Sequence, residues 1–362
     1  MAQGASANAI DAPSDTAFRI AHPGSAAAYN AAMRICVYGA GAVGGHLAAR
    51  LAAAGEDVSV VARGPQLAAV RERGIILLHG GERITGKVRA AEDPAVLGPQ
   101  DLVIVTLKAN ALSAIAEKIE LLLQRETPVV FAQNGIPWWY GLGLAASKPP
   151  PPDLSRLDPG GALRAALSVG QVVGAVVHSA NELVEPGVVE NRTPGNNMVV
   201  LGEVDDRASE RIKGIRMALE RCGISSPPAA DIRQAVWNKL VLNMGTGTLC
   251  LLTGATVAEV RGDPGVLRVH DRILAEARAI AAAHAVDVDG APRRPSGAPS
   301  SGRIVHKPSI LQDYERGRPM EVEAQLVTPL AFARVANIAT PTLDSLVPLA
   351  VHKAASKGLY PT

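Results

Sequence analysis

Lys239 and Asn243 lie four residues apart in a stretch, Asp231 to Cys250, that otherwise has the apolar pattern of a helix. A spacing of four places both side chains on one helix face. A protonated amine can donate a proton to an oxygen, and a nearby amide can orient that oxygen. The pattern therefore predicts a proton-donating pair that faces a cavity. The alternative is that Lys239 extends to water while Asn243 bonds a neighbouring backbone group; the pattern alone leaves both interpretations open.

Ser309 and Glu321 form a second candidate pair, on either side of a break at residues 316–319. We expect them in different helices, over about 303–314 and 319–336. Glu321 would then lie two residues into a helix that starts at Pro319, where the helix dipole favours a carboxylate. From the residues alone, this capping role is the favoured interpretation of Glu321.

Three glycines with the spacing G-x-G-x-x-G follow a short apolar run and precede an Ala/Leu-rich helical pattern that extends to about Ala54. This strand–turn–helix context indicates dinucleotide binding. The first glycine allows a tight turn, the second lets the backbone approach a pyrophosphate, and the third lets the helix pack on the strand. The alternative is an unliganded α/β turn. The residues that we expect to hold the pyrophosphate are Gly39, Ala40, Gly41, Ala42, Val43 and Gly44.

Arg63 comes directly after the second predicted strand, residues 57–62. A site for NAD would have Asp or Glu there, bound to the ribose 2′-hydroxyl. The planar guanidinium of arginine instead suits a 2′-phosphate. The sequence therefore favours NADP(H) as the cofactor, and the alternative is a solvated arginine in a loop.

Lys108 and Asn134 follow two further predicted strands, residues 101–106 and 128–132. Ligands of parallel sheets bind at the carboxyl ends of the strands. Lys108 there reaches the cofactor phosphates or faces solvent. The amide of Asn134 can both donate and accept hydrogen bonds, and the alternative is a turn-forming Asn-Gly pair.

The order of these elements predicts an α/β Rossmann-type N-terminal domain plus an all-helical C-terminal domain. We assign residues 34–228 to an NADP-binding domain and residues 229–362 to a helical substrate and dimerisation domain. Residues 1–33 form an extension that we expect to be disordered. Smaller predictions are a hairpin or meander from 75–78 and 87–90, a helix over 112–124, and helices over 231–252 and 264–285. A cleft between two domains is a common place for a substrate.

Composition limits the remaining possibilities. The net charge of the 362-residue chain is +2 and no long basic run occurs, which argues against a nucleic-acid partner. No apolar run approaches the roughly 18 residues that a membrane span needs. No Cys or His spacing is typical of a metal site, and three distant cysteines indicate a reducing compartment, so we expect a cytoplasmic protein without a metal.

Taken in order, these motifs resemble the ketopantoate reductase (2-dehydropantoate 2-reductase) family from about Arg34 onward. The resemblance implies reduction of 2-dehydropantoate (ketopantoate) to (R)-pantoate with NADPH, a step of pantothenate and coenzyme A biosynthesis. The matching stretches are Gly-Ala-Gly-Ala-Val-Gly44, Val-Thr-Leu-Lys108, Gln-Asn134-Gly, Trp237-Asn-Lys-Leu-Val-Leu-Asn243, Leu252-Thr-Gly-Ala-Thr256 and Lys307-Pro-Ser-Ile-Leu-Gln-Asp313, with Glu321 twelve residues after Ser309.

The resemblance also implies a role for each candidate residue. Lys239 matches the proton donor, and Glu321 matches an acidic residue at the junction of cofactor and substrate, which replaces the capping interpretation. The other matches are Asn134 with cofactor and substrate, Asn243 with substrate, Ser309 with the substrate carboxylate, the Ala180 backbone with the nicotinamide end, and Arg63 with the 2′-phosphate.

Three positions depart from the family pattern, namely Gly247, Leu326 and Val327, where relatives carry Asn, Asn and Gly. These changes remove polar groups where a hydroxyl-bearing substrate would bind. An alternative function is therefore an NADPH-dependent reductase of another branched or aromatic 2-keto acid. An alternative of another class is a non-catalytic NADP(H)-binding sensor. The apolar helical domain is also compatible with a homodimer.

Overall fold

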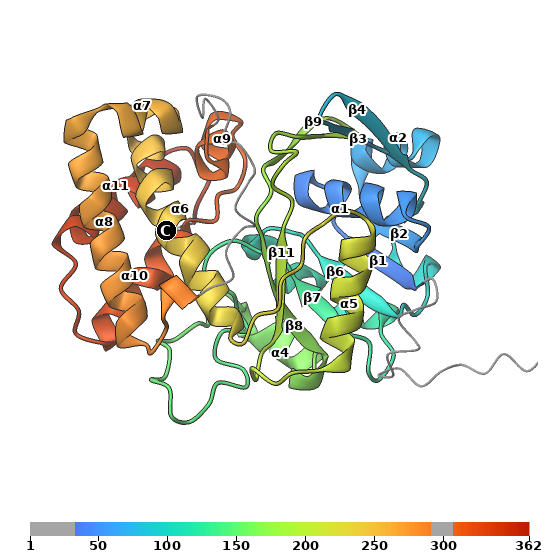
Figure 1. The fold of residues 1–362 in the computed structure, drawn as a ribbon, viewed down its shortest axis with the longest axis horizontal. Helices are drawn as coiled ribbons and strands as arrows, with labels where there is room; N and C mark the ends of the chain where they lie inside the picture. The colour runs from blue at the N-terminus through green and yellow to red at the C-terminus, as the bar shows by residue number, and fades with distance from the viewer. Residues whose placement is uncertain (1–32, 291–306, 362) are drawn as a thin grey trace, which may run out of the picture.

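The computed structural model describes residues 33–290 and 307–361. The sheets lie on one side of the molecule and helices α6 to α11 on the other, with α6 along the boundary between them (Figure 1). Within the described residues no strand follows residue 203. This arrangement confirms the predicted fold class. In the described part of the chain, no helix has both the length and the apolar character that crossing a membrane requires.

The larger sheet has seven strands in the order β11-β8-β7-β6-β1-β2-β5. All neighbours in it are parallel except β11 and β8. Its central strands are short unbroken apolar runs because both faces of the sheet are covered. The strands are β1 (Arg34–Tyr38), β2 (Asp57–Val61), β5 (Arg89–Ala91), β6 (Leu102–Val105), β7 (Val129–Phe131), β8 (Val172–Val177) and β11 (Val199–Glu203).

Helix α1 (Ala42–Ala53) packs between this sheet and a second, four-stranded one. The order of the second sheet is β4-β3-β10-β9, with β3 (Ile75–His79), β4 (Glu82–Gly86), β9 (Asn181–Glu185) and β10 (Val188–Asn191). The predicted pairing of 75–78 with 87–90 is wrong. Strand β3 pairs with β4 through a tight turn at Gly80 and Gly81, whereas β5 pairs with β2 in the larger sheet.

Other helices of the sheet-containing half are short or peripheral. They are α2 (Gly64–Arg73), α3 (Ala116–Ile119), α4 (Ala162–Ala166) and α5 (Glu210–Arg221). The predicted helix over 112–124 is broken into α3 and two flanking 3₁₀ turns, Ser113–Ile115 and Glu120–Leu122.

The helical half consists of α6 (Ile232–Thr253), α7 (Val257–Gly262), α8 (Pro264–Ala283), α9 (Ser309–Glu315), α10 (Thr328–Val335) and α11 (Pro341–Ala355). The predicted start of a helix at Pro319 is wrong: residues 318–321 are not helical, and the helix begins at Val322 with a π-helical turn, Glu323–Val327. Helices α7 and α11 have no counterpart in the predictions.

The two ends of the predicted N-terminal domain have clear packing. Met33 is buried and its N–H donates to Glu56 Oε2 at 2.9 Å, so it belongs to the fold and not to the extension. Near the other end, Pro228 still forms a bridge with Leu201 of β11, and α6 begins four residues later. The predictions for residues 1–32, 291–302 and 303–306 lie outside the described residues.

Candidate active site

The glycine turn between β1 and α1 has the geometry of a phosphate cradle. Gly39 has φ +106°, and a Cβ on Gly44 would lie 1.9 Å from the Gly39 carbonyl oxygen. A Cβ on Gly41 would meet no atom of the described residues within 4 Å, so they leave this side of the turn open to a ligand. The Thr106 hydroxyl donates to the Gly39 carbonyl at 2.6 Å and fixes the turn to the end of β6. The three glycines therefore meet the steric requirements of such a turn, and their contact with a pyrophosphate stays a prediction.

The N-terminus of α1 supplies the electrostatics of this cradle. Gly41 is the N-cap residue, and no side chain accepts from the first-turn N–H groups. Such free N–H groups and the positive end of the helix dipole favour an anion. Gln66 holds the far side of the turn: its amide donates to the Ala40 carbonyl at 2.5 Å and accepts from Gly187 N–H at 2.9 Å. These residues fit a dinucleotide.

Arg63 follows β2 and is the N-cap residue of α2. It is exposed, and among the described residues no carboxylate pairs with it. Its guanidinium is thus available at the edge of the sheet next to the glycine turn. A 2′-phosphate bound there would find an unpaired cation.

Lys239 points from α6 to the carboxyl edge of the larger sheet. Its Nζ donates to Asn134 Oδ1 at 2.7 Å, beyond β7, and to the Val177 carbonyl at 2.5 Å, at the end of β8. Burial lowers the pKa of this amine to about 8, and the Glu321 carboxylate opposes that shift. The amine is therefore mostly protonated at neutral pH and close to the pH at which it releases a proton.

Glu321 completes a chain of hydrogen bonds with the same asparagine. Its Oε2 accepts from Asn134 Nδ2 at 3.3 Å, and its Oε1 accepts from Ala109 N–H at 3.2 Å. Glu321 is buried, and burial raises the pKa of its carboxyl. Because these partners belong to the sheet-containing half, the capping interpretation is wrong, and Glu321 joins Asn134 and Lys239 across the two halves of the molecule.

The side chain of Lys108 pairs with groups of the helical half. Its Nζ lies 2.7 Å from Asp313 Oδ1 on α9 and donates to the Pro319 carbonyl at 2.9 Å. Burial raises the pKa of Asp313, and the ammonium of Lys108 works against that shift. Lys108 is thus neither fully solvated nor free for a phosphate in this arrangement.

The other predicted residues lie outside this hydrogen-bonded group. Asn243 is one turn beyond Lys239 and partly exposed, and among the described residues its amide has no hydrogen-bond partner. Ser309 is exposed at the start of α9, which packs on α6. At Ala180 the N–H donates to Thr193 Oγ1 at 3.0 Å and the carbonyl accepts from Arg192 N–H at 2.8 Å. Its backbone groups are therefore already bonded within the protein.

The three departures from the family pattern differ in position. Gly247 is buried on α6, and a Cβ there would lie 3.4 Å from Ile310 Cγ2 on α9. Leu326 is 1% exposed and belongs to the core, and Val327 packs against that core. Gly247 therefore lies on the helix that carries Lys239 and packs closely against α9, whereas Leu326 offers no surface to a ligand.

Four contacts in this region were not predicted from the sequence. They involve the Val177 carbonyl, the Ala109 N–H, and the Thr106 and Gln66 side chains. Val177 and Thr106 have a signal in their position, since both come at the carboxyl end of an apolar run. The Ala109 and Gln66 contacts depend on chain folding over long separations and have no local signal.

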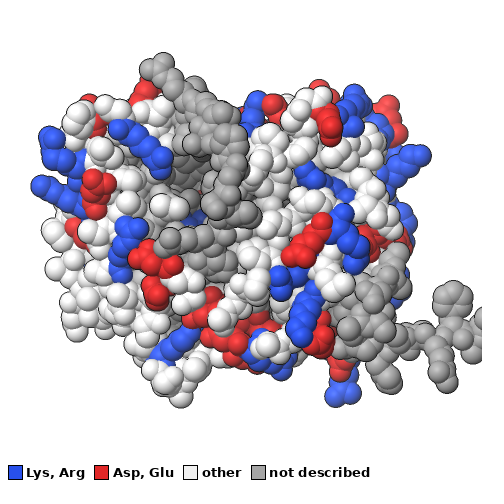
Figure 2. All heavy atoms as spheres, viewed as in Figure 1, with Lys and Arg blue, Asp and Glu red and all other residues white. Residues whose placement is uncertain are grey.

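The described residues contain no cluster of His, Cys, Asp or Glu that could hold a metal ion. On the face shown in Figure 2, acidic and basic side chains are interspersed.

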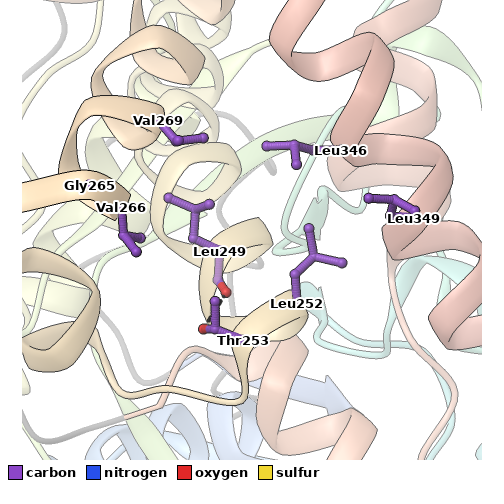
Figure 3. A pocket seen from close by; sticks show the side chains of 8 residues that line it. All are labelled: Leu249, Leu252, Thr253, Gly265, Val266, Val269, Leu346 and Leu349. Carbon is purple, nitrogen blue, oxygen red and sulfur yellow. Dashed lines mark hydrogen bonds between the residues drawn. The ribbon is translucent and has the colours of Figure 1, made fainter. Parts of the chain in front are cut away.

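A hollow of about 550 Å³ opens between α6, α8 and α11, where α8 and α11 side chains face each other across α6 (Figure 3). Its lining is almost wholly apolar: Leu249, Leu252, Thr253, Gly265, Val266, Val269, Leu346 and Leu349.

Two family models match the chain. The one described as "Ketopantoate reductase PanE/ApbA" matches residues 35–140, and the one for the C-terminal part of the same family matches residues 231–354. A 2-dehydropantoate 2-reductase from Mesorhizobium japonicum is 38% identical over 333 residues, which cover 91% of this chain and all of that protein.

Solved structures give the same result. A crystal structure assigned as a ketopantoate reductase from Ralstonia solanacearum superposes with a TM-score of 0.78 at 36% identity, covering 91% of this chain and all of the other. A D-mandelate dehydrogenase in complex with NADH and anilino(oxo)acetate superposes with a TM-score of 0.75 at 20% identity, covering 90% of this chain and all of that one, which shows a shared fold. The chain therefore belongs to the ketopantoate reductase family.

Proposed function

We propose that this protein is an NADPH-dependent reductase that converts 2-dehydropantoate to (R)-pantoate. One observation carries the proposal: the Lys239 ammonium, the Asn134 amide and the Glu321 carboxylate form one hydrogen-bonded chain at the sheet edge that also holds the glycine cradle. Family membership supports the same reaction. When bound, the reduced nicotinamide supplies the hydride that adds to the keto carbon.

Lys239 then acts as the proton donor. As the carbonyl carbon gains the hydride, its oxygen becomes an alkoxide, and one N–H bond of the ammonium breaks to protonate it. With a pKa near 8, about nine-tenths of the amine carries its proton at pH 7. The nearby Glu321 carboxylate favours the charged amine before transfer. Asn134 holds the amine through its oxygen, and we propose that it shifts toward the substrate carbonyl when a ligand enters.

Substrate and cofactor contacts follow from the positions of the remaining residues. We assign the amide of Asn243 and the hydroxyl of Ser309 to the substrate, Ser309 at its carboxylate. The turn from Gly39 to Gly44 holds the pyrophosphate and Arg63 the 2′-phosphate. Lys108 binds a cofactor phosphate only after its ammonium leaves the Asp313 carboxylate. The contact of Ala180 with the nicotinamide is assigned to its carbonyl oxygen, whose second lone pair can still accept a hydrogen bond.

A spectrophotometric assay tests the reaction. Oxidation of NADPH is followed at fixed enzyme concentration with 2-dehydropantoate and with a panel of branched and aromatic 2-keto acids. We expect the highest kcat/KM for 2-dehydropantoate. Tight NADPH binding without turnover of any acid would contradict the proposal and support the sensor.

A second candidate substrate class is favoured by one feature of the site. Gly247 lies on the same helix as Lys239 and has no polar side chain, and a Cβ there would already contact Ile310 of α9 at 3.4 Å. The missing polar group favours a 2-keto acid with an apolar branched or aromatic far end over one that carries a hydroxyl. The same panel decides: a kcat/KM for an aromatic acid well above that for 2-dehydropantoate would replace the first substrate with the second.

We also propose a homodimer, formed through the apolar hollow between α6, α8 and α11. Leu349 at its edge is 56% exposed, and large exposed apolar surfaces mark sites of association. Light scattering after gel filtration is expected to give twice the mass of the 37.5 kDa chain, and Leu349→Glu is expected to give the single mass. A native monomer would refute this.

Three buried free thiols, Cys36, Cys222 and Cys250, support a reducing, cytoplasmic location.

A further inference from the structure

A π-helical turn, Glu323–Val327, starts two residues after Glu321. Single π turns inside helices are rare and often occur at functional sites. Here the sequence gives a local reason for it, because Pro329 follows in the next turn and has no N–H. A helix that must pass a proline is free to rearrange the hydrogen bonds of the preceding turn.

The π turn releases one backbone carbonyl. The Thr328 N–H donates to the carbonyl of Glu323, five residues earlier. The Ala324 carbonyl would next take the N–H of residue 328 in an α-helix or of residue 329 in a π-helix. The first is already used and Pro329 has none, so Ala324 accepts instead from Ile136 N–H at 2.8 Å, just beyond β7.

This contact fixes the segment that carries Asn134. Gly135 has φ +82°, and a Cβ there would lie 2.4 Å from the Ala324 carbonyl oxygen. The turn after β7 can therefore approach the π turn only because residue 135 is glycine. Asn134, one residue earlier, is held against the helix that begins just after Glu321.

Gln325, inside the π turn, adds a side-chain contact to the same site. It is 4% exposed, and its amide nitrogen lies 3.4 Å from Glu321 Oε2, the oxygen that also accepts from Asn134. Hydrogen bonds of this kind favour the charged form of a buried carboxyl. The contact is at the long end of the range for a hydrogen bond.

We propose that Gln325 is a positioning residue for the reduction: held by the π turn, its amide orients the Glu321 carboxylate, which in turn orients Asn134 against the Lys239 amine. This inference rests on the proposed reductase function. Gln325 acts through Glu321 and touches neither substrate nor cofactor. The consequence is a carboxylate held in one rotamer, with an amide donor that favours its ionised form against the effect of burial.

Three other charged groups around Glu321 also influence the pKa of its carboxyl. Lys239 faces it from α6, Lys108 from the loop after β6, and Asp313 from α9. Lys108 favours the ionised carboxylate and Asp313 disfavours it. A variant of Gln325 leaves all three unchanged, so a shift in Glu321 titration reports the amide contact alone.

The test compares Gln325→Met, which removes the donor at nearly constant length, with Leu326→Met, which alters the neighbouring buried side chain. In Gln325→Met we expect kcat with 2-dehydropantoate to fall about three- to tenfold at an unchanged KM for NADPH, as loss of one weak hydrogen bond to a charge predicts. The acid limb of the kcat–pH profile should move up by about half a pH unit, because the carboxyl loses a donor to its ionised form. Leu326→Met should keep both values.

Titration of the Glu321 carboxyl by ¹³C NMR, assigned by the signal lost in Glu321→Gln, gives a readout without turnover. Its midpoint should rise in Gln325→Met and not in Leu326→Met. An unchanged midpoint in Gln325→Met, or equal effects of both variants, would overturn the inference. If the native protein reduces no 2-keto acid, the proposed function fails, and the NMR midpoint alone still decides whether Gln325 holds Glu321.

Discussion

The two walls of the site are built in different ways. The sheet-containing wall presents mainly backbone: the glycine turn from Gly39 to Gly44, the Val177 carbonyl and the Ala109 N–H. The helical wall presents side chains, Lys239 and Glu321, from elements that are far apart in the sequence. In the proposed function, backbone groups hold the dinucleotide, a ligand common to many enzymes, whereas the side chains of Lys239 and Glu321 set the reaction. The comparison teaches that cofactor binding and proton transfer depend on different parts of this molecule.

The most severe test of this division is removal of the amine. Lys239→Met should lower kcat by about 10²–10⁴, the usual value of a positioned proton donor, with little change in NADPH affinity. Lys353→Met is a matched control, because Lys353, like Lys239, donates to a backbone carbonyl, in its case that of Leu252 on α6 at 3.1 Å. Stopped-flow turnover and NADPH fluorescence separate the two effects. A near-native kcat in Lys239→Met would remove the lysine from this role.

The backbone wall should fail differently. In Gly44→Ala the added Cβ collides with the Gly39 carbonyl, which costs about 3 kcal/mol of unfolding free energy, or more than a hundredfold in the folding equilibrium. Gly41→Ala is the control, since its Cβ meets no protein atom within 4 Å. The Gly41→Ala variant should keep its native stability in urea unfolding and lose affinity for NADPH. Equal stability of the two variants would show that the turn is not close-packed.

The pH dependence distinguishes the walls without mutation. Burial lowers the pKa of Lys239 to about 8, so its protonated form is lost as the pH rises through that value. We expect kcat to be flat between the acid limb set by Glu321 and about pH 8, and to fall about tenfold per unit above it, as loss of one proton from Lys239 requires. NADPH affinity, which depends on the backbone wall, should stay constant over that range. A kcat that is flat to pH 10 would contradict Lys239 as the donor.

The difference between the backbone wall and the side-chain wall also explains which features the sequence could predict. The glycine turn is local: strand, turn and helix are consecutive, and Gly39 and Gly44 each answer a steric need within six residues or at a neighbouring strand end. The strands β1, β2, β6 and β7 were likewise predicted, because each is a short apolar run bounded by turn residues. Strand β5 was misassigned, since nothing in its three residues tells which sheet it joins.

The helical wall had no such local signal. Lys239 on an apolar helix left two interpretations open, and only its contacts with Asn134 and Val177, 105 and 62 residues away, distinguish them. For Glu321 the local rule favoured a cap, and the tertiary contacts prevailed. The resemblance to a known family implied a place for Glu321 at the junction of cofactor and substrate, which stays a prediction. The π turn depends on Pro329 together with Ile136, a pairing that sequence spacing does not reveal.

The smallest expected effect concerns the boundary of the backbone wall, where one side chain chooses the cofactor. Arg63 is exposed and pairs with no carboxylate among the described residues, so its removal should cost little stability. Arg63→Ala should weaken NADPH about ten- to thirtyfold, the value of one charge-assisted contact, and NADH less than twofold. Arg63→Lys should recover part of the NADPH affinity, because it restores the charge but not the planar fork. Titration of both cofactors by fluorescence measures this. If both nucleotides weaken equally, the 2′-phosphate lies elsewhere, and the cradle alone does not specify which dinucleotide it holds.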